Sequence, residues 1–99
     1  MERRSTKSKK RTSLEQVTLE YQSEGACEVF VAGTFNDWSP DRDRLQWAGS
    51  DGLFRATLAL PKGRYEYRFV VDNSWCTDPR NPEWVANDQG STNSVLLVG

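Results

Sequence analysis

The sequence predicts an all-β fold, an immunoglobulin-like antiparallel β-sandwich of about seven strands. From residue 14 onward the dominant hydrophobic period is two, and no segment of helical length shows the 3.6-residue period of an amphipathic helix. Clusters of turn-forming residues separate the alternating segments at the short intervals typical of antiparallel strands. A chain of 99 residues is the size of one domain, which argues against a multidomain enzyme.

The first two strands are expected over residues 17–22 and 27–32. In the first, Val17, Leu19 and Tyr21 alternate with polar residues, so one face should be buried. The second (CEVFVA) is almost continuously apolar, as expected of a central strand that is covered on both faces.

Two longer strands are expected over residues 53–60 and 64–71, with turns before, between and after them. Successive side chains of a strand point to opposite faces. The core-facing residues are then Phe54, Ala56, Leu58 and Leu60 in the first strand and Tyr65, Tyr67, Phe69 and Val71 in the second. The outward-facing residues of the second strand are Arg64, Glu66, Arg68 and Val70. Arg68 is therefore expected on an exposed sheet face.

The last third of the chain is expected to contain one strand between irregular segments. Residues 72–74 (DNS) predict a tight turn, and residues 78–82 (DPRNP) contain too much proline for regular structure. Residues 94–98 (SVLLV) predict a final buried strand.

A change of charge divides the chain into a basic arm and an acidic body. Residues 1–13 carry six Lys and Arg against one Glu, whereas residues 14–99 carry seven against thirteen acidic residues. We expect residues 1–13 to form a flexible N-terminal arm, either a solubilising tail or a weak phosphate-binding segment, and residues 14–99 to form the folded domain. The arm lacks the apolar segment of a secretory signal, so a cytoplasmic location is expected.

The composition argues against most catalytic and metal chemistry. The chain has no histidine, the commonest general base and metal ligand. Cys27 and Cys76 lack the CxxC spacing of zinc and redox motifs, and we expect them to be reduced thiols. No apolar run approaches the roughly 18 residues of a membrane span. We therefore expect no cofactor, no metal and no membrane partner.

Two of the four tryptophans fall in turn-forming segments. Trp38 ends the run GTFNDW, and Trp75 lies two residues after Asn73. Leaving a large apolar side chain in water costs about 1.5–3 kcal/mol. Each indole must therefore fold back over the sandwich or receive a ligand. Trp47, at strand spacing in LQW, is assigned to the core or to sheet packing, and Trp84 stays unassigned.

Three segments carry a resemblance to a known family. They are VFVAGTFNDWSP, GLFRATLALPKGRYEYRFVVDNSW and DPRNPEWVANDQGSTNSVLLV, and together they span about residues 15–98. Their motifs and order resemble the glycogen-binding module of the AMP-activated protein kinase beta subunit, and equally the isoamylase-type early-set domains of carbohydrate-binding module family 48. The resemblance implies an early-set β-sandwich that binds α-glucans.

The resemblance also implies a set of site residues. Two tryptophans of such modules form a platform for a curved α-1,4-glucan, and they correspond to Trp38 and Trp75. The lysine of the preceding strand corresponds to Arg68, and the asparagine before the final strand corresponds to Asn93, with the small hydroxyl residue near it at Ser91. Where kinase-type modules have a leucine that reaches through the sugar curl, this chain has Gln89.

The side-chain chemistry agrees with that assignment. A pyranose presents an apolar C–H face and a rim of hydroxyls, which indole rings, Arg donors and an Asn amide can contact. We predict a non-catalytic carbohydrate-binding module for α-1,4/α-1,6-glucans such as glycogen, starch and maltooligosaccharides. The carboxylates that a glycosidase would need stand instead in turn-forming contexts, namely Asp37, Asp41, Asp43, Asp72, Asp78 and Asp88.

Two other functions remain open at this point. One is a protein-interaction or scaffold domain that recruits or regulates a partner enzyme or kinase subunit without binding sugar, through Trp47, Trp84 or a sheet edge. The other is nucleic-acid binding through residues 3–11, which the acidic body disfavours, so a nucleic-acid partner is not expected.

Overall fold

Antiparallel strands make up nearly all the regular structure of the chain. The computed structural model describes residues 13–26, 28–49 and 51–99. Within these ranges the elements are β1 (Leu14–Gln22), β2 (Val29–Gly33), the short 3-10 helix η2 (Thr34–Asn36), β3 (Asp43–Arg44), β4 (Gln46–Trp47), β5 (Leu53–Pro61), β6 (Gly63–Val71), β7 (Ser74–Cys76), β8 (Trp84–Ala86) and β9 (Thr92–Val98). The arm expected over residues 1–13 lies almost wholly outside the described residues and stays a prediction.

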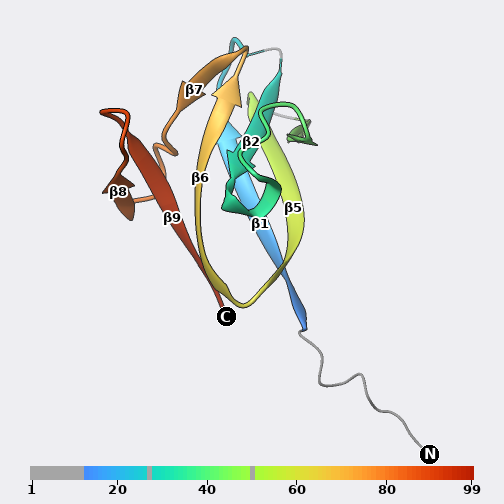
Figure 1. Ribbon diagram of the computed structural model, residues 1–99. Coiled ribbons are helices and arrows are strands. Elements are labelled where there is room, and N and C mark those ends of the chain that lie inside the picture. The colour runs from blue at the N-terminus through green and yellow to red at the C-terminus, as the bar shows by residue number, and fades with distance from the viewer. Residues whose placement is uncertain (1–12, 27, 50) are drawn as a thin grey trace, which may run out of the picture.

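The strands form two sheets that pack as a sandwich. One sheet has the order β1-β5-β4, and the other has the order β3-β2-β6-β9-β8, with β7 paired to β6. All pairs are antiparallel, and β1 passes behind β2 and β6 in Figure 1. This confirms the predicted fold class. The structure adds strands of two or three residues, β3, β4, β7 and β8, which are too short to show an alternating pattern in the sequence.

The core lies between the two sheets and contains most of the residues that alternation assigned to it, Leu60 and Tyr65 being the exceptions. Its buried members are Leu19, Val29, Val31, Leu45, Phe54, Tyr67 and Phe69. The rings of Tyr67 and Phe69 meet edge to face with their centroids 5.7 Å apart. Val70, expected to face outward, is in fact only 4% exposed. It lies opposite Trp75 of β7 on one side and Phe30 of β2 on the other, so neighbouring strands flank it on the outer face.

A buried carboxylate holds the proline-rich segment after β7 against the core. The Tyr67 hydroxyl donates to Asp78 Oδ2 over 2.6 Å, and the amide of Asn81 donates to the Tyr67 oxygen over 3.1 Å. Burial, followed by the carboxylate, raises the pKa of Tyr67 far above its ordinary value. Asp78 also forms the predicted turn, because its Oδ1 accepts the backbone N–H of Arg80 over 2.9 Å. This aspartate is structural.

Trp47 does not lie in the core, one of the two places that the sequence assigned to it, but in a strand of a sheet. Its side chain is 62% exposed. The reason is that β4 is a two-residue strand at the edge of its sheet, hydrogen-bonded to β5 alone, so nothing beyond it covers the indole.

Two further observations bear on earlier expectations. Cys76 carries a free thiol, whereas Cys27 lies outside the described residues. No helix in the ranges above has the length and apolar character needed to cross a bilayer.

Candidate functional site

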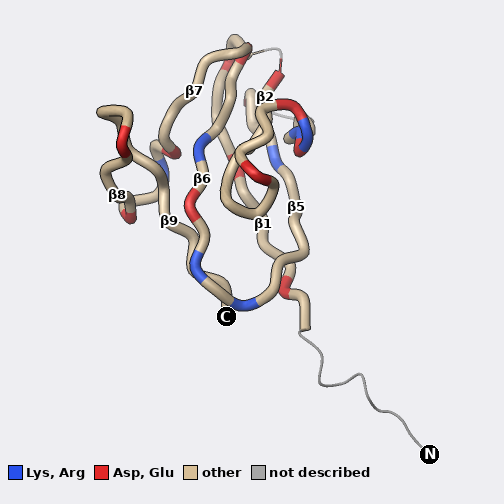
Figure 2. The backbone as a smooth tube through the Cα atoms, in the orientation of Figure 1, with Lys and Arg blue, Asp and Glu red and all other residues tan. Residues whose placement is uncertain are grey.

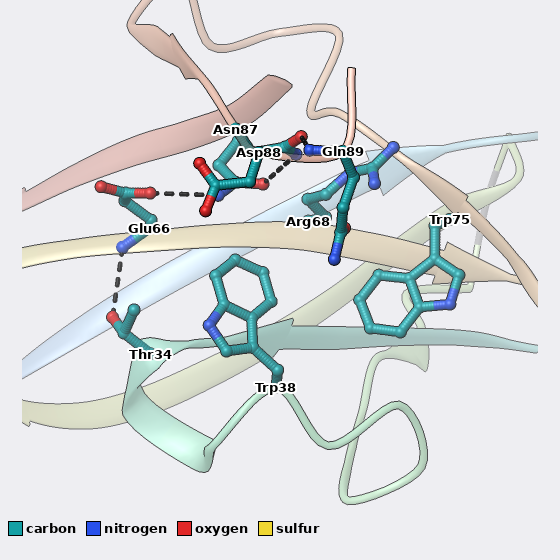
Figure 3. Close-up of a pocket in the computed structure, with 9 residues that line it drawn as sticks. Thr34, Trp38, Glu66, Arg68, Trp75, Asn87, Asp88 and Gln89 are labelled. Atoms are coloured by element: carbon teal, nitrogen blue, oxygen red, sulfur yellow. Dashed lines mark hydrogen bonds between the residues drawn. The ribbon is translucent and has the colours of Figure 1, made fainter. Parts of the chain in front are cut away.

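A cavity of about 630 Å³ lies on the outer face of the six-stranded sheet. Its lining comes from η2 and the loop after it, from β6 and β7, and from the β8–β9 loop and the start of β9. The lining residues are Thr34, Trp38, Glu66, Arg68, Trp75, Asn87, Asp88, Gln89 and Asn93 (Figure 3). Five of the six residues predicted for the site therefore line one cavity, and Ser91 is the exception.

Trp38 is held at this cavity by a tightly bonded loop. Its backbone N–H donates to the Gly33 carbonyl over 2.8 Å, and its own φ is +60°. A side chain at Gly33 would place its Cβ 2.6 Å from the Glu66 carbonyl oxygen, so only glycine lets the loop approach β6 this closely. The buried amide of Asn36 stabilises the loop through four hydrogen bonds. Its Nδ2 donates to the Val31 carbonyl over 3.0 Å and to Asp43 Oδ2 over 2.7 Å. Its Oδ1 accepts the backbone N–H groups of Gly33 over 3.0 Å and Ser39 over 3.2 Å.

Trp75 lies in a strand, and not in the turn that the sequence suggested. Asp72 and Asn73 adopt positive φ values of 46° and 71° and form the turn, after which β7 folds back along β6. Trp75 pairs with Val70, so both side chains project to the outer face of the sheet. In Figure 3 the Trp38 and Trp75 side chains approach the cavity from different segments of the chain, and Trp75 is 41% exposed.

Arg68 lies on the outer face of β6, as alternation predicted, but it is half-buried there. Its Nε atom is buried and has no hydrogen-bond partner among the described residues. An unpaired buried donor costs about 1–3 kcal/mol. The guanidinium of Arg68 also lines the cavity, and its nitrogens can only donate hydrogen bonds.

Asn93 is buried at the cavity, with both sides of its amide engaged. Its Nδ2 donates to Glu66 Oε1 over 3.0 Å, and its Oδ1 accepts from Asn87 Nδ2 over 3.1 Å. Ser91 lies in the adjoining loop, where its backbone N–H donates to Asn87 Oδ1 over 3.1 Å. The structure thus gives Ser91 a part in the loop that borders the cavity.

Sequence reasoning missed four residues of the lining, namely Thr34, Glu66, Asn87 and Asp88. Glu66 was predictable, since the alternation that placed Arg68 on the outer face places Glu66 there too. Figure 2 shows basic and acidic positions alternating along β6. The hydrogen bond from Asn93 and then that from Arg64 lower the pKa of Glu66, so it is ionised at neutral pH. The other three depend on how loops fold over the sheet.

An antiparallel sandwich with two indoles, a guanidinium and amide groups around one open cavity has the make-up of a carbohydrate-binding module. Residues 15–99 match the family model described as the glycogen recognition site of AMP-activated protein kinase. The chain belongs to this family, which confirms the resemblance that its motifs indicated.

Curated relatives agree with this assignment. The chain is 40% identical over 76 residues to the mouse 5'-AMP-activated protein kinase subunit beta-2, an alignment covering 77% of this chain and 27% of that protein. It is 38% identical over 74 residues to the pig subunit beta-1, covering 75% of this chain and 57% of that protein. The match thus spans between about a quarter and just over half of the length of these relatives.

Proposed function

We propose that the cavity binds α-1,4/α-1,6-glucans, among them glycogen, starch and maltooligosaccharides, and that it does so without catalysis. The observation that carries the proposal is that Trp38 and Trp75, far apart in sequence, line the same cavity. Membership of a glycogen-recognition family supports it independently.

The chemistry of the lining suits a neutral sugar chain. Each indole offers an apolar surface to the C–H face of a glucose unit, and the guanidinium of Arg68 offers N–H donors to hydroxyl oxygens. Gln89, whose amide reaches between the two indoles in Figure 3, supplies a donor and an acceptor where kinase-type modules have a leucine. Binding by stacking on so small a surface predicts affinities in the range of about micromolar to millimolar.

Titration with maltoheptaose tests the proposal. Tryptophan fluorescence and calorimetric heat should both saturate, with the same dissociation constant at 50 mM and 500 mM salt, because the ligand is uncharged. Cellobiose-type β-1,4 oligomers serve as the control, since their extended shape does not match a curved platform. The absence of a saturable signal at millimolar maltoheptaose would contradict glucan binding.

We also propose a second function, docking onto a kinase subunit or other partner enzyme in the cytoplasm. The relatives are subunits of a kinase, and Trp47 and Trp84 are 62% and 58% exposed at positions outside the glucan cavity. The free thiol of Cys76 suits a reducing compartment. Purified catalytic subunit of the related kinase should bind the wild type and Trp38→Ala equally and Trp47→Ala or Trp84→Ala more weakly. Equal binding by all four proteins would contradict docking through these residues.

A further inference from the structure

Hydrogen bonds connect β6 to the loop that overhangs the glucan cavity. The connection runs from Glu66 Oε1 to the amide of Asn93, on to the amide of Asn87, and from Asn87 Oδ1 to the backbone N–H groups of Gln89 (2.9 Å) and Ser91 (3.1 Å). We propose that Glu66 is the positioning residue of this relay: its carboxylate sets the orientation of both amides and thereby holds Gln89 over the two indoles. This inference rests on the glucan-binding function proposed above.

The two ends of the relay permit only one direction of hydrogen bonding. An ionised carboxylate can only accept hydrogen bonds, and a backbone N–H can only donate them. Asn93 must therefore turn its Nδ2 toward Glu66 and its Oδ1 toward Asn87. Asn87 must in turn present Nδ2 to Asn93 and Oδ1 to the loop. Each donor then meets an acceptor. Rotating either amide by half a turn would place a donor against a donor or an acceptor against an acceptor.

The loop at the far end is held largely by Asn87. Besides accepting two N–H groups on its side chain, Asn87 donates its own backbone N–H to the Ser91 carbonyl over 3.0 Å. Gly90, with φ of +77°, lets the chain reverse between these contacts. Figure 3 shows Gln89 descending from this loop toward the space between Trp38 and Trp75. The position of the Asn87 side chain thus sets the position of Gln89.

Glu66 is itself fixed on both sides. Its second oxygen, Oε2, accepts from Arg64 Nη1 over 2.9 Å, and its backbone N–H donates to Thr34 Oγ1 at the start of η2 over 3.2 Å. The relay therefore links η2, which precedes the loop of Trp38, to the loop that carries Gln89. Asn93, the residue expected to contact sugar, stands in the middle of the relay.

Three variants separate the orientation of the relay from the charge of Glu66. Glu66→Gln keeps an acceptor oxygen for Asn93 and should leave maltoheptaose affinity within about threefold of wild type. Glu66→Lys replaces the acceptor by a donor, forces the amides to reverse and should weaken binding by about tenfold or more, as for one lost buried hydrogen bond. Arg55→Gln, the control, removes an ion pair with Glu20 on the other sheet, leaves the relay intact and should change affinity less than twofold.

A spectroscopic readout tests the relay without sugar. The readout is the NMR chemical shifts of the nitrogen-15-labelled chain, taken from the side-chain amides of Asn87 and Asn93 and the backbone amides of Gln89 and Ser91. These shifts should be the same in wild type and Glu66→Gln. They should all change in Glu66→Lys. Coupled shifts with a tenfold loss of affinity support the proposal. Unshifted signals in a folded Glu66→Lys protein, or undiminished affinity, would overturn it. If the wild-type protein does not bind maltoheptaose, the proposed glucan binding is wrong, whereas the amide signals still test the hydrogen-bond relay.

Discussion

The four tryptophans form two pairs in different surroundings. Trp47 and Trp84 are 62% and 58% exposed, more than the 41% of Trp75, and both stand in strands of two or three residues at sheet edges. Trp38 and Trp75 instead share a cavity with a guanidinium and several amides. An exposed indole is thus not by itself a mark of a sugar site. The convergence of two indoles with polar side chains around one cavity is a stronger mark, and the contrast between the two pairs can be tested directly.

Removing each pair of indoles should produce the largest difference. The double variant Trp38→Ala/Trp75→Ala is expected to lose maltoheptaose binding by at least about a hundredfold, since each stacked ring contributes roughly 1.5–3 kcal/mol. The matched double variant Trp47→Ala/Trp84→Ala should bind within twofold of wild type. Calorimetric titration measures the maltoheptaose affinity of both variants, after circular dichroism shows that they are folded. Similar losses in both would erase the distinction between the pairs.

A smaller loss of maltoheptaose affinity is expected when the arginine of the cavity is replaced. An arginine on the opposite sheet serves as the comparison. Arg68→Met removes the guanidinium from the cavity and should weaken maltoheptaose binding by about tenfold. Because it also removes the buried, unpaired Nε, it should leave the free energy of unfolding unchanged or slightly higher. Arg55, which pairs with Glu20 over 2.8 Å on the other sheet, is the matched control.

Arg55→Met should leave the sugar affinity unchanged and lower the free energy of unfolding by less than about 1 kcal/mol, as for an exposed ion pair. Glucan titration and urea unfolding of both variants provide the measurements. A glucan affinity that Arg68→Met does not alter would mean that the guanidinium of Arg68 contacts no ligand atom.

Alternation in the sequence predicted the parts of this molecule that depend on long strands. It placed the faces of β1, β5 and β6, and hence Arg68, because nine-residue strands show a clear period of two. It failed for Trp47 and for the strand that carries Trp75, because strands of two and three residues have no measurable period. Family motifs, and not periodicity, pointed to Asn93. No local pattern could show that its amide joins Glu66 to Asn87, since those three residues meet only through tertiary pairing.

The smallest expected effect is on pH dependence, and it separates the cavity from the rest of the surface. The chain has no histidine, and the hydrogen bonds from Asn93 and then Arg64 lower the pKa of Glu66, a carboxylate of the cavity. The contribution of ionised Glu66 to the stability of the cavity is therefore fully present above the usual glutamate pKa of about 4.3. It is lost only as the pH falls through the lower pKa that Glu66 has in the folded protein. Maltoheptaose affinity should be constant from about pH 8 to about pH 5 and decline only in stronger acid.

Glu66→Gln, which cannot titrate, should keep its affinity further into the acid range than wild type, for as long as the fold persists. Fluorescence titrations at matched pH values, with far-ultraviolet circular dichroism to follow folding, distinguish the two curves. If both proteins lose affinity together while still folded, ionisation elsewhere controls the cavity. Protonation of Glu66 would then cause no loss of its own, because the neutral carboxyl would still present an acceptor oxygen to Asn93, as the amide of Glu66→Gln does.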